Sequence, residues 1–215
     1  MAEDRNGLER KREELERTLR QRLSEGDRDG TATRVIESYG PEIYSFLVAV
    51  HRNEADADEV FALFAEAFWQ ALTTFAGNST FRTFAYAIAR RLSFRYRRDT
   101  ARKNKRLHAL ESSSMSRLVH EVRTKTAVFL RTETRSRLVA LRASLPQEDQ
   151  ELLMLRVDRE LSWDALVEVL RGDDESPLTP DVRKREAARL RKRFQLIKDR
   201  LREMARREGL LGEAD

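Results

Sequence analysis

Apolar residues that recur at helical spacing constrain the fold of this chain more than any other feature. The clearest example is segment 81–98, which holds six arginines and no acid. One stripe of the helix predicted there is apolar, with Phe81, Ala85, Ile88, Leu92 and Tyr96. The opposite face mixes Thr83, Tyr86, Arg90, Phe94 and Arg97. The segment therefore predicts an amphipathic helix with a basic, aromatic face.

The same spacing recurs along most of the chain. It predicts helices at about residues 32–51, 55–75, 81–104, 146–157, 162–170 and 180–207. With 8 glycines and 4 prolines in 215 residues, the chain is poor in the turn residues that an all-β fold needs. We therefore predict an all-α fold, in which two small helical domains are joined by a partly helical linker.

Breaks in the helical pattern set the predicted domain boundaries. Residues 1–30 form a charged N-terminal extension, whose marginal helix is expected to be partly ordered and followed by a linker over Ser24–Thr33. The first domain spans 31–104, the interdomain linker 105–136, and the second domain 137–210.

Several short segments are predicted to start or stop helices. Gly77–Thr80 interrupts the helical pattern, and Ser79 or Thr80 can cap the helix that follows. Ser162 and Thr179 are predicted N-caps of later helices, and Gly172–Pro177 reads as a flexible acidic loop.

Charge is strongly segregated along the chain. Residues 54–66 hold five acids and no base, residues 81–106 hold ten bases and one acid, and residues 183–207 hold twelve bases and three acids. The net charge of +5 favours an acidic partner. The chain has no cysteine, and its three histidines lie far apart. We therefore predict no catalytic, cofactor or metal site.

Basic and aromatic residues on one helix face suggest a protein that handles opened DNA or RNA. Arginine neutralises phosphates, and an aromatic ring can stack on an unpaired base. The alternative is a solvated basic face, with Tyr86 and Phe94 covered by loops. In the second half, a short helix followed by a connection and a long basic helix is the order of a helix-turn-helix, and the alternative there is a plain three-helix bundle.

Three stretches resemble a known family, the bacterial sigma factors of the extracytoplasmic-function type. Asp56–Phe61 through Trp69–Leu72 is similar to the family's polymerase-binding helix. Phe75–Phe84 through Ile88–Leu92 is similar to its −10-element segment. Leu145–Glu148, with Leu153–Arg156 and Leu161–Trp163, is similar to the start of its −35-element domain.

This resemblance implies a partner and a role for each charged surface. The first domain would be region two, which binds a coiled coil of the polymerase β′ subunit through Asp56, Asp58, Glu59, Ala62, Leu63 and Glu66. The same domain would read the −10 element and hold the opened strand through Asn78, Ser79, Thr80, Arg82, Tyr86, Arg90, Arg91, Phe94, Arg97 and Arg98. The second domain would be region four, a helix-turn-helix that reads the −35 element through Lys184, Arg185, Arg189, Arg191 and Lys192. The β flap and an anti-sigma factor are further candidate partners.

The chain departs from the family pattern at a few positions. Ala62-Leu63 stands where the family usually has a polar pair, often Gln-Glu, and Arg91 stands where it often has Asn. The turn before the recognition helix is replaced by the longer segment Gly172–Pro180.

Two other functional classes remain open from the sequence. One is a helix-turn-helix regulator that binds DNA without polymerase. The other is an inactive sigma-like adaptor, which Ala62-Leu63 supports. A recombinase or nuclease is disfavoured because no nucleophilic or metal-binding cluster is visible. A sigma factor would act in the cytoplasm, and we predict no membrane partner because no apolar stretch is long enough to cross a bilayer.

Overall fold

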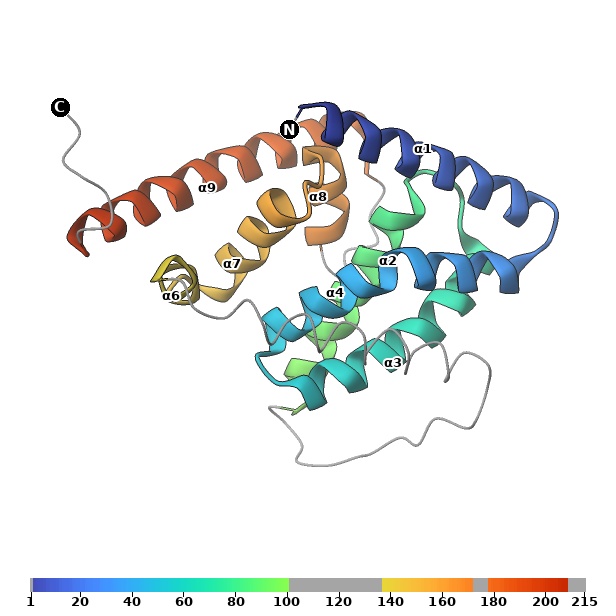
Figure 1. Cartoon of the computed structure of the whole chain (residues 1–215), viewed down its shortest axis with the longest axis horizontal. Coiled ribbons are helices and arrows are strands. Elements are labelled where there is room, and N and C mark those ends of the chain that lie inside the picture. Colours follow the sequence, from blue (N-terminus) through green and yellow to red (C-terminus); the bar gives the residue numbers. More distant parts are fainter. Residues whose placement is uncertain (1, 101–136, 172–177, 209–215) are drawn as a thin grey trace. The chain divides into compact units, whose positions relative to one another are not determined.

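The computed structural model describes residues 2–100, 137–171 and 178–208. Within these ranges every regular element is a helix, which confirms the predicted all-α fold. The chain divides into two compact units, Met1–Ala127 and Val128–Asp215 (Figure 1). The predicted linker 105–136, the loop 172–177 and the end of the helix predicted at 81–104 lie wholly or partly outside the described residues.

The described part of the first unit contains four α-helices. They are α1 (Ala2–Ser24), α2 (Arg28–His51), α3 (Glu54–Ala71) and α4 (Phe81–Thr100), with a 3-10 turn η1 (Leu72–Thr74) at the end of α3. Figure 1 draws them from blue to green. The helices predicted at 32–51 and 55–75 are thus confirmed to within a few residues.

The N-terminal segment is more regular than the sequence predicts. α1 is continuous to Ser24, and α2 begins at Arg28, so the predicted linker over Ser24–Thr33 is wrong. The reason is Asp27, whose carboxylate accepts a hydrogen bond from the Gly30 amide at 2.9 Å. A capped N-terminus satisfies amides that would otherwise lack a partner, so α2 starts early.

The core of the first unit is rich in aromatic rings from α3. Phe61, Phe64 and Phe68 are fully buried, and successive ring centroids lie 5.6 and 5.8 Å apart. Phe68 also meets Phe84 of α4 at 5.9 Å. Since three- and four-residue steps bring side chains to one face of a helix, this cluster follows from the spacing in the sequence.

Within the residues described, the second unit has four α-helices, drawn from yellow to red in Figure 1. They are α6 (Arg137–Ala143), α7 (Gln147–Leu153), α8 (Trp163–Leu170) and α9 (Pro180–Arg207), with a π-helical segment η2 (Met154–Asp158) after α7. The Ser162 hydroxyl accepts from the Ala165 amide, and the Thr179 hydroxyl accepts from the Val182 amide. Both predicted N-caps are therefore confirmed.

An arginine ties the long helix α9 to α7. Arg193 donates from Nε to Asp149 at 2.7 Å and from an Nη atom to Glu148 at 2.9 Å. Burial by itself would lower the pKa of Arg193, but the hydrogen bonds and charges of the two carboxylates outweigh it and raise that pKa. In the part of the chain described, no helix is long and apolar enough to cross a membrane.

Candidate nucleic-acid and polymerase interfaces

The loop Gly77–Thr80 joins η1 to α4 and turns the chain sharply. Gly77 has a φ of +71°, which glycine adopts without the steric cost that other residues incur. The Thr80 hydroxyl accepts a hydrogen bond from the Thr83 amide at 3.0 Å, which confirms the predicted cap. Asn78 and Thr80 are exposed, and Ser79 is half-buried. The loop thus presents small polar side chains beside the start of a basic helix.

The first half of α4 is buried, which corrects part of the predicted DNA interface. Tyr86 is fully buried, and its ring packs edge-on against Phe46 of α2 at 5.7 Å. Arg82 is only 7% exposed, and Thr83 is buried as well. The expectation that Thr83 and Tyr86 lie on an exposed face is therefore wrong. Because Tyr86 and Arg82 are both buried, we no longer assign either of them to DNA. Helix α2 contributes Phe46 to the cover of Tyr86.

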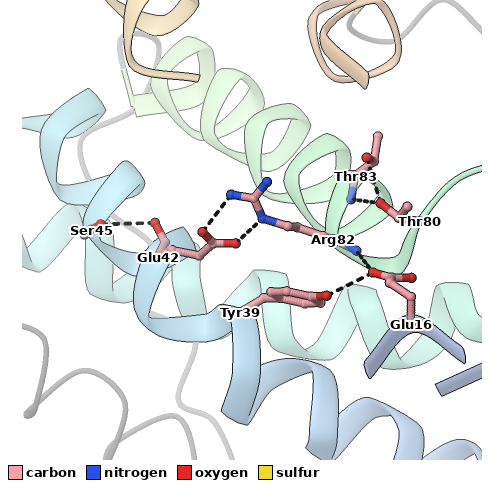
Figure 2. Close-up of polar contacts among 7 residues, drawn as sticks. All are labelled: Glu16, Tyr39, Glu42, Ser45, Thr80, Arg82 and Thr83. Carbon is pink, nitrogen blue, oxygen red and sulfur yellow. Dashed lines mark hydrogen bonds and ion pairs between the residues drawn. The ribbon is translucent and has the colours of Figure 1, made fainter. Parts of the chain in front are cut away.

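Arg82 is held by a carboxylate instead of a phosphate. Its Nε and Nη2 atoms donate to the two oxygens of Glu42 on α2, at 2.6 and 2.8 Å (Figure 2). Burial would lower the pKa of Arg82, but the hydrogen bond and charge of Glu42 outweigh it and raise that pKa. A bidentate pair of this kind fixes geometry as well as charge. Arg82 therefore joins α4 to α2.

The second half of α4 carries the exposed basic and aromatic surface. Phe94 is 50% exposed, and Arg98 beside it on the next turn is exposed too. Arg90, Arg91 and Arg97 are half-buried. This group, which we call the α4 basic surface, consists of Arg90, Arg91, Phe94, Arg97 and Arg98. An exposed ring among guanidinium groups is the combination that binds single-stranded nucleic acid.

A buried carboxylate that the sequence does not reveal lies at the N-terminus of α4. Glu16 of α1 accepts from the Phe81 amide at 2.8 Å and from the Arg82 amide at 3.1 Å. The Tyr39 hydroxyl of α2 donates to the same carboxylate at 3.0 Å (Figure 2). Burial, and then the charge of Glu16, raise the pKa of Tyr39 well above its usual value. In sequence, Glu16 is one acid among many in a charged segment.

The loop Gly77–Thr80 is also in contact with α1. The guanidinium of Arg20 donates to the carbonyl oxygens of Gly77 and Ser79, at 3.1 and 2.9 Å. Nothing in the local sequence connects Arg20 to this loop, because the partners are 57 and 59 positions apart. The C-terminal half of α1 and the loop Gly77–Thr80 therefore form one structural unit.

The acidic residues predicted to meet polymerase fall into two groups. Asp56 and Asp58 are half-buried and accept hydrogen bonds from Tyr96 and Tyr44, at 2.9 and 2.7 Å. These two carboxylates hold α3 against α4 and α2. Glu59 is half-buried, and Glu66 is exposed. The acidic surface that a partner could reach is therefore centred on Glu59 and Glu66.

The two apolar residues of the predicted polymerase contact differ in exposure. Ala62 is only 6% exposed, so its assignment to the polymerase interface is withdrawn. Leu63 is half-buried and stays a candidate. Because α3 packs on two helices, Ala62 lies on the core side of the helix and Leu63 at its edge.

The five basic residues predicted to read DNA lie on the exposed side of α9. They are Lys184, Arg185, Arg189, Arg191 and Lys192. The side chain of Arg189 is 79% exposed and lies 3.5 Å from Glu186, one turn earlier. The guanidinium of Arg191 lies 5.5 Å from the centre of the Trp163 ring of α8. The opposite side of the helix is packed, since Ala187 and Ile197 are buried.

The comparison with known families gives one match. Residues 35–103 match the model of sigma-70 region 2. A search of curated proteins finds no match. The matched range covers α2, α3 and α4, and thus includes the loop Gly77–Thr80 and the α4 basic surface.

Proposed function

From the premise that this chain is a sigma-70 family factor, we propose that it is an alternative sigma factor of the extracytoplasmic-function type. It would direct bacterial RNA polymerase to specific promoters in the cytoplasm and help to open them. Sigma-70 region 2 supports a role in polymerase binding and promoter melting, and the sigma-70 family is not a class of enzymes. The match of residues 35–103 to that region is the observation that carries the proposal.

The exposure of side chains supports a division of the opening step between two elements. The loop Gly77–Thr80 would contact a flipped base of the −10 element through Asn78 and Thr80. Phe94 would stack on a neighbouring unpaired base, and the arginines of the α4 basic surface would hold phosphates. Flipping a base costs a few kcal/mol, and stacking on an aromatic ring contributes about 1–3 kcal/mol per base. One exposed ring with phosphate contacts can therefore offset the cost.

The second unit would read duplex DNA upstream. α9 is 28 residues long, or about 42 Å, and the five bases predicted to read DNA lie exposed in its N-terminal half. The N-terminal part of a recognition helix is the part that enters the major groove. This arrangement favours a −35 contact through Lys184, Arg185, Arg189, Arg191 and Lys192. Core polymerase would meet the acidic surface of Glu59 and Glu66.

Run-off transcription tests the proposal. Bacterial core polymerase, with and without the protein, is supplied with a library of random-sequence duplex templates, and the transcripts are sequenced. We expect transcripts that start at a fixed distance from a shared pair of upstream sequences, and only when the protein is present. DNA binding without any transcription would favour the regulator, and polymerase binding without transcription would favour the adaptor.

A charge-reversal variant tests the polymerase surface. Glu59→Lys with Glu66→Lys should weaken core binding and make it less dependent on salt, because complementary charges at an interface speed association. The matched control is Glu9→Lys with Glu13→Lys, which makes the same charge change at two exposed positions of α1. Asp58 is left intact because it accepts the hydrogen bond from Tyr44. If the two double variants bind core polymerase with equal affinity, α3 is not part of the interface.

A further inference from the structure

We propose that α1 is a built-in support of the strand-reading loop, and that Glu16 and Arg20 are positioning residues for promoter opening. This inference rests on the proposed function. It assigns a role to the N-terminal extension, which lies before the matched region 2 at 35–103. Neither residue needs to touch a base, because each acts through the backbone of Gly77–Arg82.

One stripe of α1 faces the rest of the first unit. Leu19 and Arg20 lie three and four residues after Glu16, and Leu23 lies four and three residues after them, so all four share a face of the helix. Leu19 is fully buried, and Glu16 is 9% exposed, whereas Leu8 nearer the N-terminus is 55% exposed. The C-terminal half of α1 is therefore the docked half. Buried Leu19 holds this half of α1 in place beside the polar contacts of Glu16 and Arg20.

Glu16 occupies the N-terminus of α4. The first amides of a helix have no partner within the helix and attract anions. Here the amides of Phe81 and Arg82 donate to Glu16, and the amide of Thr83 donates to Thr80. A DNA phosphate would have to displace Glu16 to bind these amides. The start of α4 is thus closed to DNA, and its orientation is set by α1.

Arg20 holds the loop Gly77–Thr80 itself. Its two hydrogen bonds hold the carbonyls of Gly77 and Ser79, which flank Asn78. Asn78 itself is exposed, so the contact leaves its side chain accessible to a base. Of the five N–H donors of a guanidinium, these bonds use two. Arg20 is exposed, and its charge therefore lies beside the loop where a phosphate backbone would pass.

The two contacts together would lower the cost of capturing a base. A loop that must become ordered on binding loses conformational entropy, and part of the binding energy offsets this loss. A loop already held at Gly77, Ser79 and Phe81 loses less. Weakening the support should therefore affect the opened complex, in which the loop contacts a base, and spare the closed complex.

Hydrogen exchange in the free, full-length protein tests the support directly. We compare Glu16→Gln and Arg20→Ala with Arg17→Ala, which removes the same charge from an exposed position of α1. Glu16→Gln should speed exchange at the Phe81 and Arg82 amides at least tenfold, because an amide nitrogen replaces one accepting oxygen. Circular dichroism shows whether Glu16→Gln unfolds the helix. If it does, the surface variant Arg20→Ala decides the test, and its exchange is measured at the amides of residues 78–80. Exchange in Arg20→Ala equal to that in Arg17→Ala would overturn the proposal.

Promoter opening tests the consequence, with a promoter selected by the wild-type holoenzyme from the random library. Arg20→Ala should lower permanganate-reactive open complex at least fivefold and change closed-complex affinity less than twofold, and Arg20→Lys should recover part of the loss. A premelted template should not restore Arg20→Ala fully, because the loop is still unsupported. If Arg20→Ala and Arg17→Ala form equal amounts of open complex, the role of α1 is overturned but the proposed function is not. A wild-type holoenzyme that opens no promoter would overturn the proposed function with it.

Discussion

The helices α4 and α9 are both basic and amphipathic, but their surroundings differ. α4 packs against α2 and α3 and has α1 at its start, so its first half is buried and Arg82 is neutralised by Glu42. α9 contacts α6, α7 and α8 along one side, and the five bases predicted to read DNA stay exposed on its other side. A basic helix therefore offers a surface for DNA only where neighbouring helices leave one face uncovered.

Two aromatic residues of α4, Tyr86 and Phe94, provide the largest test of this contrast. Tyr86→Ala should destabilise the protein by about 3–5 kcal/mol, because it leaves a cavity beside Phe46. Phe94→Ala should change stability by less than about 0.5 kcal/mol but reduce open complex severalfold. Chemical unfolding and permanganate footprinting measure the two effects. A large stability loss in Phe94→Ala would show that this ring belongs to the core.

Arg82 and Arg98 make the same comparison for charge. Arg82→Ala should cost about 3 kcal/mol, because removing one member of a buried pair leaves Glu42 without its ion-pair partner. Arg98→Ala, at an exposed position of the same helix, should leave the free energy of unfolding nearly unchanged. Equal unfolding midpoints in the two variants would contradict the assignment of Arg82 to the interior.

In α9 the corresponding change should affect DNA and not stability. Arg189→Ala should lower promoter affinity at least tenfold, or about 1.4 kcal/mol, if the arginine contacts a guanine or a phosphate. Arg202→Ala, about three and a half turns further from the N-terminus, serves as the control because it is also exposed. Fluorescence anisotropy with a selected promoter duplex measures both. Comparable losses would show that charge, and not position on α9, governs binding.

The contacts at the N-termini of α4 and α9 should make stability depend on pH in different ways. Since the folded state raises the pKa of Tyr39 above its ordinary value of about 10, the unfolded chain loses that proton first. This contribution to stability is complete below pH 10 and is lost as the pH rises further, by about 1 kcal/mol near pH 11. Urea unfolding of the parent and of Tyr39→Phe between pH 8 and 11 isolates it. The N-cap of α9 is Thr179, which does not titrate. Substitutions of Thr179 should therefore leave the dependence of stability on pH unchanged. The same slope in Tyr39→Phe and the parent would refute this assignment.

Local patterns in the sequence were sufficient for the helices and for several of their ends. Thr80, Ser162 and Thr179 cap amides only three residues away, so their roles depend on the chain within one turn. Two of the three stretches that resemble sigma factors lie within residues 35–103, which match sigma-70 region 2, and the third, at 145–163, lies outside that match. The predicted bases of α9 are exposed because its apolar and basic residues already fall on different sides.

What only the tertiary structure decided is which side chains remain available for a partner. Arg82 is paired with a residue 40 positions away, and the α4 amides bind Glu16 from 65 and 66 positions away. The sequence by itself determined that α4 is basic, aromatic and amphipathic. It could not determine that α1 and α2 cover the first half of that helix, because burial depends on which distant segments pack together and not on the spacing of residues within one helix.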